Sequence, residues 1–256
     1  MKRLRLSLGN KPAISINMIP ILSGKYDLIE SLPIGIDPDC IDVVVPLCIA
    51  DYDILRANPL FEGKALFPSA STVSLCHDKF AFREWFKKHF SAAYLPADDC
   101  STPLVIAKPR QGEWGHNTYL VDASNQAVIA AVRSDPAMYL ENYVPGQREY
   151  SMHILFAQGQ LIYAALSTYD HAQANYVQGV TDQPIPTTIV ECDEIPKIFH
   201  DLLTTLNYSG AANIDYKIDE TGQIRIFELN PRIGGSIAYL TDSYIAAYVE
   251  YIQQRK

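Results

Sequence analysis

The sequence lacks long apolar runs and paired cysteines. No apolar run among its 256 residues approaches the roughly 20 residues needed to cross a bilayer, which argues against a membrane protein. The five cysteines are odd in number and widely scattered, and no two of them form a C-x-x-C pair. This spacing argues against a zinc site or a disulfide framework and predicts reduced thiols.

Positive charge is also scarce. The chain has 21 Lys and Arg residues against 29 Asp and Glu residues, so its formal net charge is -8 and its pI is near 5.2. This balance argues against a general nucleic-acid or anionic-membrane binder, although it is compatible with a local basic site. The charged residues 1–5 are followed by polar residues and Pro12 rather than by the apolar stretch of a signal peptide, so we expect a cytoplasmic protein.

Two common catalytic signatures are missing as well. The N-terminal region contains no glycine-rich dinucleotide fingerprint, and the chain offers no recognisable serine or cysteine triad. With 48% hydrophobic residues it can nevertheless bury a sizeable core. Residues 1–75 have the pattern of a small α/β lobe, with strands predicted over residues 41–47 and 64–68 and a helix over residues 51–58.

An aromatic stripe marks the next predicted element, a helix over residues 78–90. Its aromatic side chains recur at helical spacing and predict a core-facing side; they are Phe82, Trp85, Phe86 and Phe90. Asp78 is a suitable N-cap for this helix. Lys79 lies in the first turn, where its charge opposes the helix dipole, so either a nearby phosphate or exposure to solvent must account for it.

From residue 102 onward the pattern changes to short strands and turns. Strands are predicted over residues 103–108, 118–121, 127–132, 138–144, 150–156 and 161–167, and an amphipathic helix over residues 193–206. A glycine-bearing loop at residues 112–117 separates the first two strands. Such a unit can fold over phosphates, with Lys108 as a point charge and Arg110 as a fork.

The segment of residues 141–151 lies between two of these strands. Its extended backbone can hydrogen-bond the edge of an adenine base, and a carboxylate farther along can accept hydrogen bonds from ribose hydroxyls. An ordinary strand and turn is the alternative interpretation of the same residues.

Two alternating runs near the C-terminus predict a hairpin. Residues 211–218 place Asn213, Asp215 and Lys217 on one face. A polar loop with one glycine follows, and the second run begins at residue 224. The hairpin would therefore bring Asp215 close to the polar side chains of the second run.

The second run alternates in the same way. Glu228 and Asn230 share one face, while Phe227 and Leu229 are predicted to point to the other. Carboxylates together with an amide oxygen, and Arg232 two residues later, suit a hard divalent cation and a polyphosphate. A solvated hairpin with its polar face in water is the alternative.

A helix is predicted after this hairpin. Its apolar positions recur at helical spacing and are Ile237, Leu240, Tyr244, Tyr248 and Ile252. Ser236 precedes them and is the expected N-cap.

Four blocks of the sequence resemble the ATP-grasp superfamily in order and spacing. They are residues 108–110 with the glycine loop, residues 143–149, residues 212–215 and residues 227–236. The last block, Glu-x-Asn-Pro-Arg followed by Gly-Gly-Ser, is the specific one. The branch that the chain resembles most is that of the ATP-binding lobes of the carbamoyl phosphate synthetase large chain, and the resemblance covers about residues 68–245.

The resemblance implies an α+β ATP-grasp fold with a short N-terminal α/β lobe. That lobe would comprise residues 1–75, and the ATP-grasp domain residues 76–256. Within this domain, residues 102–144 would form the flap or lid lobe and residues 145–256 the C-terminal lobe with the metal site. ATP would bind between two lobes with Mg²⁺, for which Mn²⁺ is an alternative.

Site residues follow from the same resemblance. Those implied for the nucleotide are Lys79, Lys108, Gly112, Gly115, Glu141, Tyr143, Val144 and Glu149. The lysines would contact phosphates, the glycines belong to the closing loop, residues 141–144 would hold adenine, and Glu149 would hold ribose. The metal ligands would be Asp215, Glu228 and Asn230. Arg232 and Lys108 would be the catalytic residues.

The activity implied is that of an ADP-forming carbon–nitrogen ligase. Such an enzyme phosphorylates a small-molecule carboxylate to an acyl phosphate, which an amine then attacks. An ATP-binding regulatory or scaffold subunit without ligase activity is the alternative. A fragment of carbamoyl phosphate synthetase itself is disfavoured by the single ATP lobe and the lack of a glutamine-hydrolysing domain.

Some positions depart from the family pattern. Glu113 and Trp114 stand in the flap where small residues are frequent, and residues 168–179 lack the Arg or Lys often found there. His153 and His171 are better explained as polar surface or core residues than as substrate contacts. The N-terminal lobe is short for the family, so part of the acceptor site is expected either to be missing or to be supplied by a second copy of the chain or another partner chain. No nucleic-acid or membrane partner is expected.

Overall fold

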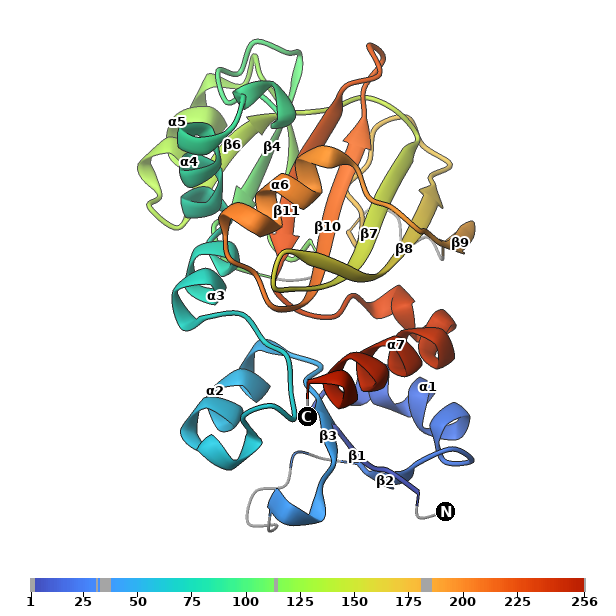
Figure 1. The fold of residues 1–256 in the computed structure, drawn as a ribbon. Helices are drawn as coiled ribbons and strands as arrows, with labels where there is room; N and C mark the ends of the chain where they lie inside the picture. Colours follow the sequence, from blue (N-terminus) through green and yellow to red (C-terminus); the bar gives the residue numbers. More distant parts are fainter. Residues whose placement is uncertain (1–2, 31, 33–37, 113–114, 181–185, 256) are drawn as a thin grey trace.

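The computed structural model describes residues 3–30, 32, 38–112, 115–180 and 186–255. Its first sheet is parallel, with strand order β2-β1-β3, and lies at the end of the molecule that holds the chain's N-terminus (Figure 1). The strands are β1 (Arg5–Leu8), β2 (Asp27–Ile29) and β3 (Val43–Val45). Helix α1 (Pro12–Leu22) connects β1 to β2, and the 3-10 turn η1 (Pro38–Cys40) precedes β3. Helix α2 (Ile49–Ala57) and the 3-10 turn η2 (Pro59–Phe61) follow β3. The predicted α/β lobe is therefore present.

The strand predicted over residues 64–68 is wrong, because this segment has no ladder of its own. Val44 N donates to Lys64 O over 2.8 Å. Leu66 N donates instead to the hydroxyl of Tyr248, over 2.6 Å. The segment's backbone groups are thus satisfied partly by a side chain from the last helix.

Helices α3 (Ala70–His77) and α4 (Lys79–His89) and the turn η3 (Ala92–Tyr94) lead to the second sheet. The Asp78 side chain caps α4 by accepting a hydrogen bond from Ala81 N over 2.9 Å. Phe82 and Phe86 are buried, and Trp85 packs against the same core cluster. The predictions of the cap and of a core-facing aromatic stripe are both confirmed.

The second sheet is antiparallel, with strand order β5-β4-β6. Its strands are β4 (Leu104–Pro109), β5 (Tyr119–Asp122) and β6 (Met138–Asn142). The strand predicted over residues 127–132 is wrong, because these residues belong to helix α5 (Gln126–Ser134). Asn125 caps this helix through Val128 N, and Ile129 packs against the sheet with Val132, one turn away. The alanines between the β-branched residues favour the helix.

The third sheet is also antiparallel and has the order β11-β10-β7-β8-β9. Its strands are β7 (Arg148–Ala157), β8 (Gln160–Asp170), β9 (Thr188–Glu191), β10 (Gly210–Ile218) and β11 (Ile224–Asn230). Helix α6 (Lys197–Thr205) covers one face, where Phe199 and Leu202 enter the core with Ile154 and Ile214. The opposite face of β7 and β10 carries polar side chains along the cavity, while Leu155 and Ala211 on that face join the core cluster of the first sheet.

The chain then makes the 3-10 turn η4 (Gly235–Leu240) and helix α7 (Thr241–Gln254). The predicted N-cap Ser236 is wrong, because α7 begins five residues later and the Ser236 hydroxyl is buried among polar side chains. Helix α7 returns to the first sheet, where it lies beside α1 (Figure 1). Tyr248 and Ile252 share a core cluster with Leu6 and Val43. No helix in the described ranges is long and apolar enough to cross a membrane.

Candidate active site

A cavity of about 650 Å³ lies between the second and third sheets. Every site residue implied by the family resemblance lines it: Lys79, Lys108, Gly112, Gly115, Glu141, Tyr143, Val144, Glu149, Asp215, Glu228, Asn230 and Arg232. Glu113 and Trp114 of the predicted flap lie outside the described residues. The fold thus brings together residues that are dispersed over more than half of the sequence.

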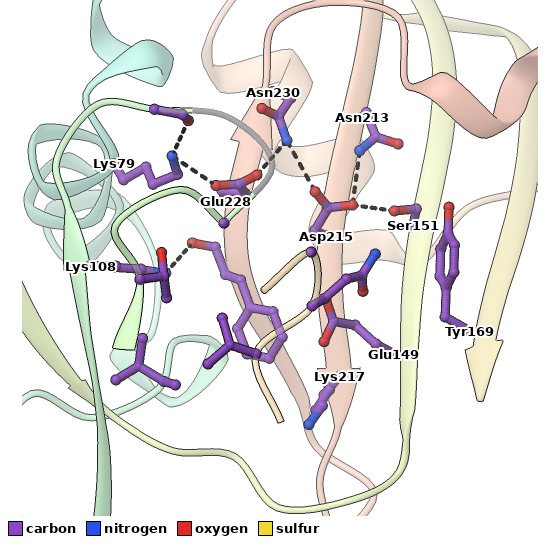
Figure 2. A pocket seen from close by; sticks show the side chains of 18 of the residues that line it. Lys79, Lys108, Glu149, Ser151, Tyr169, Asn213, Asp215, Lys217, Glu228 and Asn230 are labelled. Carbon is purple, nitrogen blue, oxygen red and sulfur yellow. Dashed lines mark hydrogen bonds and ion pairs between the residues drawn. The ribbon is translucent and has the colours of Figure 1, made fainter. Parts of the chain in front are cut away.

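The hairpin of β10 and β11 builds the acidic part of the cavity. Asp215 stands directly opposite Glu228 in the antiparallel register, and Asn213 stands opposite Asn230. Asn230 Nδ2 donates to Asp215 Oδ2 over 3.1 Å and to Glu228 Oε1 over 2.7 Å. Ser151 Oγ also donates to Asp215. Figure 2 shows these groups meeting at the centre of the site.

The predicted alternation fails at Phe227. The register shifts between Asp215 and Tyr216, so β11 carries one extra residue there. Phe227 therefore lines the cavity beside Glu228, while Ile226 and Leu229 enter the core. A bulge re-aims side chains in this way because two residues of one strand oppose a single residue of its partner.

The two carboxylates differ in their electrostatic surroundings. Burial raises the pKa of Asp215 to about 7, and the nearby charge of Glu228 adds to the effect. Burial also acts against ionisation of Glu228, but the ammonium groups of Lys79 and Lys108 lower its pKa below the ordinary value. A divalent cation would favour the ionised form of both carboxylates.

Lys79 has a partner on each side. Its Nζ lies 3.3 Å from Glu228 Oε2 and donates to Gly112 O over 2.6 Å. Only 13% of its side chain is exposed, so exposure to solvent does not explain this lysine in the first turn of α4. Its position links the start of the flap to the acidic part of the cavity.

Lys108 is held by a buried salt bridge. Its Nζ lies 2.6 Å from Glu141 Oε1, and Arg83 Nη1 lies 3.5 Å from the other oxygen of the same carboxylate. The Glu141 side chain is therefore engaged with cations. Arg110, predicted as a phosphate fork, instead pairs with the cap residue Asp78 at 2.6 Å and is absent from the described lining of the cavity.

The end of the cavity near Tyr143 contains two residues to which the sequence assigned no role. Tyr176 donates its hydroxyl to Glu149 Oε2 over 3.3 Å. Lys217 Nζ donates to the carbonyl oxygens of Val144, over 3.0 Å, and Gly146. Burial raises the pKa of Glu149 to about 7 and lowers that of Lys217 to about 8. We call this region the base end; it comprises residues 143–146, Glu149, Tyr176 and Lys217.

A buried polar cluster adjoins Arg232, and the sequence did not predict it. His153 Nε2 lies 2.7 Å from Ser236 Oγ and 3.1 Å from Ser167 Oγ, and Tyr169 donates to Ser236 over 3.0 Å. Burial, with the charge of Arg232, lowers the pKa of His153 to about 3. His153 is a buried, neutral histidine that also lines the cavity.

The same cluster explains a glycine of the last sequence block. A Cβ on Gly234 would lie 2.4 Å from His153 Cε1 and 2.7 Å from Asn213 Oδ1. Such contacts are too short for any side chain. A glycine at position 234 is therefore required by the histidine packed beneath it.

The chemistry of the donors distinguishes between metals. Within the described ranges, no group of three or more His, Cys, Asp or Glu side chains is arranged to hold a metal. Asp215 and Glu228 offer two carboxylates, and Asn230 adds an amide oxygen when its side chain is turned over, since its nitrogen faces both carboxylates here. This set is too small for a closed protein cage but fits Mg²⁺, which is commonly held by one or two carboxylates together with substrate phosphates.

The arrangement of two antiparallel sheets around this cavity is the ATP-grasp fold. The chain belongs to the family described as carbamoyl-phosphate synthase L chain, ATP binding domain, which it matches over residues 114–243. The predicted fold and family are thereby confirmed. A search of curated proteins found no match.

Solved structures with similar folds include three from bacteria. The L-amino acid ligase from Bacillus licheniformis is 15% identical, with a TM-score of 0.58 over 99% of this chain and 74% of that chain. The D-alanine–D-alanine ligase from Bacillus anthracis, complexed with ATP, is 13% identical, with a TM-score of 0.60 over 99% and 98%. The biotin carboxylase domain of the Hydrogenobacter thermophilus 2-oxoglutarate carboxylase, in complex with MgADP and bicarbonate, is 15% identical, with a TM-score of 0.60 over 100% and 70%.

Proposed function

We propose that the protein is an ATP- and Mg²⁺-dependent ligase that activates a carboxylate as an acyl phosphate for attack by an amine. The observation that carries this proposal is the meeting of Asp215, Glu228 and Asn230 with Lys79 and Lys108 in one cavity. Two carboxylates with two ammonium groups beside them suit a metal-bound polyphosphate.

The nucleotide would lie along the cavity. Lys79 and Lys108 would contact its phosphates, under a flap that begins at Gly112 and includes Gly115. Glu141, Tyr143 and Val144 would border the adenine, and Glu149 would accept hydrogen bonds from the ribose. Because the Glu141 carboxylate already pairs with Lys108, its side chain would act on the nucleotide indirectly, by fixing that lysine beside the phosphates.

In the acidic part of the cavity, the main requirement is to neutralise charge. Asp215, Glu228 and Asn230 would hold Mg²⁺, which supplies positive charge to the phosphates when it is bound. A carboxylate substrate and a phosphoryl group repel each other, and at reduced dielectric this repulsion amounts to several kcal/mol at contact distance. Arg232 and Lys108 would offset it and stabilise the charge that develops during transfer.

The reaction would proceed in two transfers. A carboxylate oxygen of the substrate attacks the terminal phosphorus of ATP, the bond from that phosphorus to ADP breaks, and an acyl phosphate results. The nitrogen of the amine then attacks the acyl carbon, phosphate leaves, and the amine gives up a proton. Neither step requires a nucleophilic side chain, in agreement with the lack of a recognisable triad.

The similar structures support this class, since two of the three are amino-acid ligases. We further propose the lobe boundaries at residues 75, 102 and 145, a cytoplasmic location, and an acceptor site completed by a second copy of the chain or another chain. A regulatory ATP-binding subunit is the second candidate. It is favoured by the lack of Lys or Arg in residues 168–179, and by Tyr176, which already contacts Glu149.

The deciding experiment combines binding and turnover. Thermal unfolding with ATP and Mg²⁺ should show an increase in Tm that EDTA reverses. ADP release should then appear in one of several pools of carboxylates and amines, and only when both classes are supplied together. Binding without release in any pool would support the regulatory subunit, and an absence of binding would contradict both candidates.

A further inference from the structure

Strand β10 passes through the whole cavity. Its polar side chains Asn213, Asp215 and Lys217 all line the cavity, and they follow one another along the site in Figure 2. Asn213 lies by the buried histidine cluster, Asp215 in the acidic part and Lys217 at the base end. Lys217 is only 2% exposed, yet the reaction proposed above gives it no role.

The contacts of Lys217 are unusual for a lysine. Its Nζ donates to Val144 O over 3.0 Å and to Gly146 O over 2.9 Å, and it lies 4.2 Å from the ring centre of Tyr176 and 4.9 Å from that of Tyr143. Within the described ranges, these carbonyls and rings, rather than a carboxylate at salt-bridge distance, surround the ammonium. Burying an ammonium is costly without such partners, so the geometry of both segments is tied to this one charge.

The two segments that meet at Lys217 are far apart in sequence. Residues 143–146 link β6 to β7, and Tyr176 belongs to the segment that follows β8. The Tyr143 hydroxyl donates to Ala174 O over 3.0 Å and accepts from Tyr176 N over 3.3 Å. Lys217 therefore sits beneath a junction that forms the wall of the base end.

We propose that Lys217 is a positioning residue for the nucleotide base. It holds the carbonyls of residues 144 and 146, together with Tyr176, in the arrangement that receives the base. This inference rests on the proposed nucleotide site and adds Lys217 to the residues that form it. It requires that Lys217 control affinity for the adenosine part of ATP and leave the phosphate and metal part unaffected.

The test is Lys217→Met, which keeps a long side chain and removes the charge and its donors. We expect ATP to bind about ten- to a hundred-fold more weakly, the range for losing charged hydrogen bonds, by isothermal titration calorimetry. Turnover at saturating ATP should stay within about twofold, because binding alone has changed. Lys197→Met is the matched control: that side chain is 86% exposed and pairs only with Asp201 on its own helix among the described residues.

Partial ligands separate positioning from general damage. Adenosine can occupy only the base end, and tripolyphosphate with Mg²⁺ only the other. Lys217→Met should weaken adenosine as strongly as ATP and leave tripolyphosphate unchanged. Should this variant fail to fold, Lys217→Arg is compared in the same way; it keeps the charge but moves the donors, so a smaller loss confined to adenosine and ATP is expected.

Two results would overturn the inference: unchanged adenosine affinity, or equal weakening of adenosine and tripolyphosphate. Failure of the wild-type protein to bind ATP would instead overturn the proposed function. Wild-type binding is measured first, so the two failures are distinguishable.

Discussion

The two sides of the cavity differ in the sequence separation of the residues that form them. On the hairpin side, Asn230 bonds Glu228 and Asp215, which are 2 and 15 positions away. At the base end, Lys217 reaches Val144 across 73 positions. The hairpin side is built from charged residues that are close in sequence. The base end forms only when the whole domain has folded. Changes on the hairpin should therefore affect chemistry most, and changes on the other walls should affect stability and binding.

The largest effect is expected from Glu228→Gln, which removes one charge from the hairpin at constant size. ADP release should fall by about a hundred- to a thousand-fold, the range for deleting one preorganised electrostatic group. The Tm without ligand should change little, since the substitution also removes a like-charge contact with Asp215.

Glu250→Gln is the matched control, because this carboxylate is exposed on α7 and should have no effect on turnover. Unchanged ADP release in Glu228→Gln would contradict the assignment of the metal site. A large loss of Tm would contradict the view of the hairpin as locally determined.

The hairpin could be predicted because its information is local. Alternation placed Asp215 on one strand and Glu228 on the next, and a short polar loop set them opposite each other. The one local error, Phe227, came from a bulge, which adds a residue without any signature in the polar pattern.

Two features outside the hairpin were not predicted from spacing. Residues 127–132 contain three β-branched side chains, but the alanines between them, a cap at Asn125 and packing of Ile129 make them helical. Serine is a favoured N-cap residue, but the Ser236 hydroxyl is hydrogen-bonded to the buried His153, 83 positions away. For Ser236 a tertiary contact outweighed a local preference, whereas for residues 127–132 the local cap and alanines agree with the packing of Ile129.

An effect of intermediate size is expected at His153, which lies in a part of the cavity built by contacts between residues far apart in sequence. The prediction concerns how the free energy of unfolding depends on pH. Its pKa in the folded protein is about 3, against about 6.5 for an unfolded chain. As the pH falls below about 6.5 the unfolded state takes up the proton first, so the free energy of unfolding falls by about 1.4 kcal/mol per pH unit. Between pH 6.5 and 4.5 the wild type should lose about 2–3 kcal/mol more than His153→Gln, measured by urea unfolding.

His89→Gln is the matched control, because this imidazole is exposed on α4. Parallel curves for the wild type and His153→Gln would show that the histidine is not buried in its neutral form.

The smallest effect is expected from Tyr176→Phe, which sharpens the comparison at the base end. The variant keeps the ring over Lys217 and removes the hydroxyl that donates to Glu149. If Glu149 receives the ribose, ATP no longer competes with this hydroxyl, and one released hydrogen bond of about 0.5–1.5 kcal/mol corresponds to ATP binding about two- to ten-fold more tightly. Tyr143→Phe should not tighten binding, because the Tyr143 hydroxyl contacts Ala174 and Tyr176 rather than Glu149. Weaker binding in Tyr176→Phe would mean that the hydroxyl belongs to the nucleotide-binding arrangement itself, and the base end would then be preformed rather than opened by the ligand.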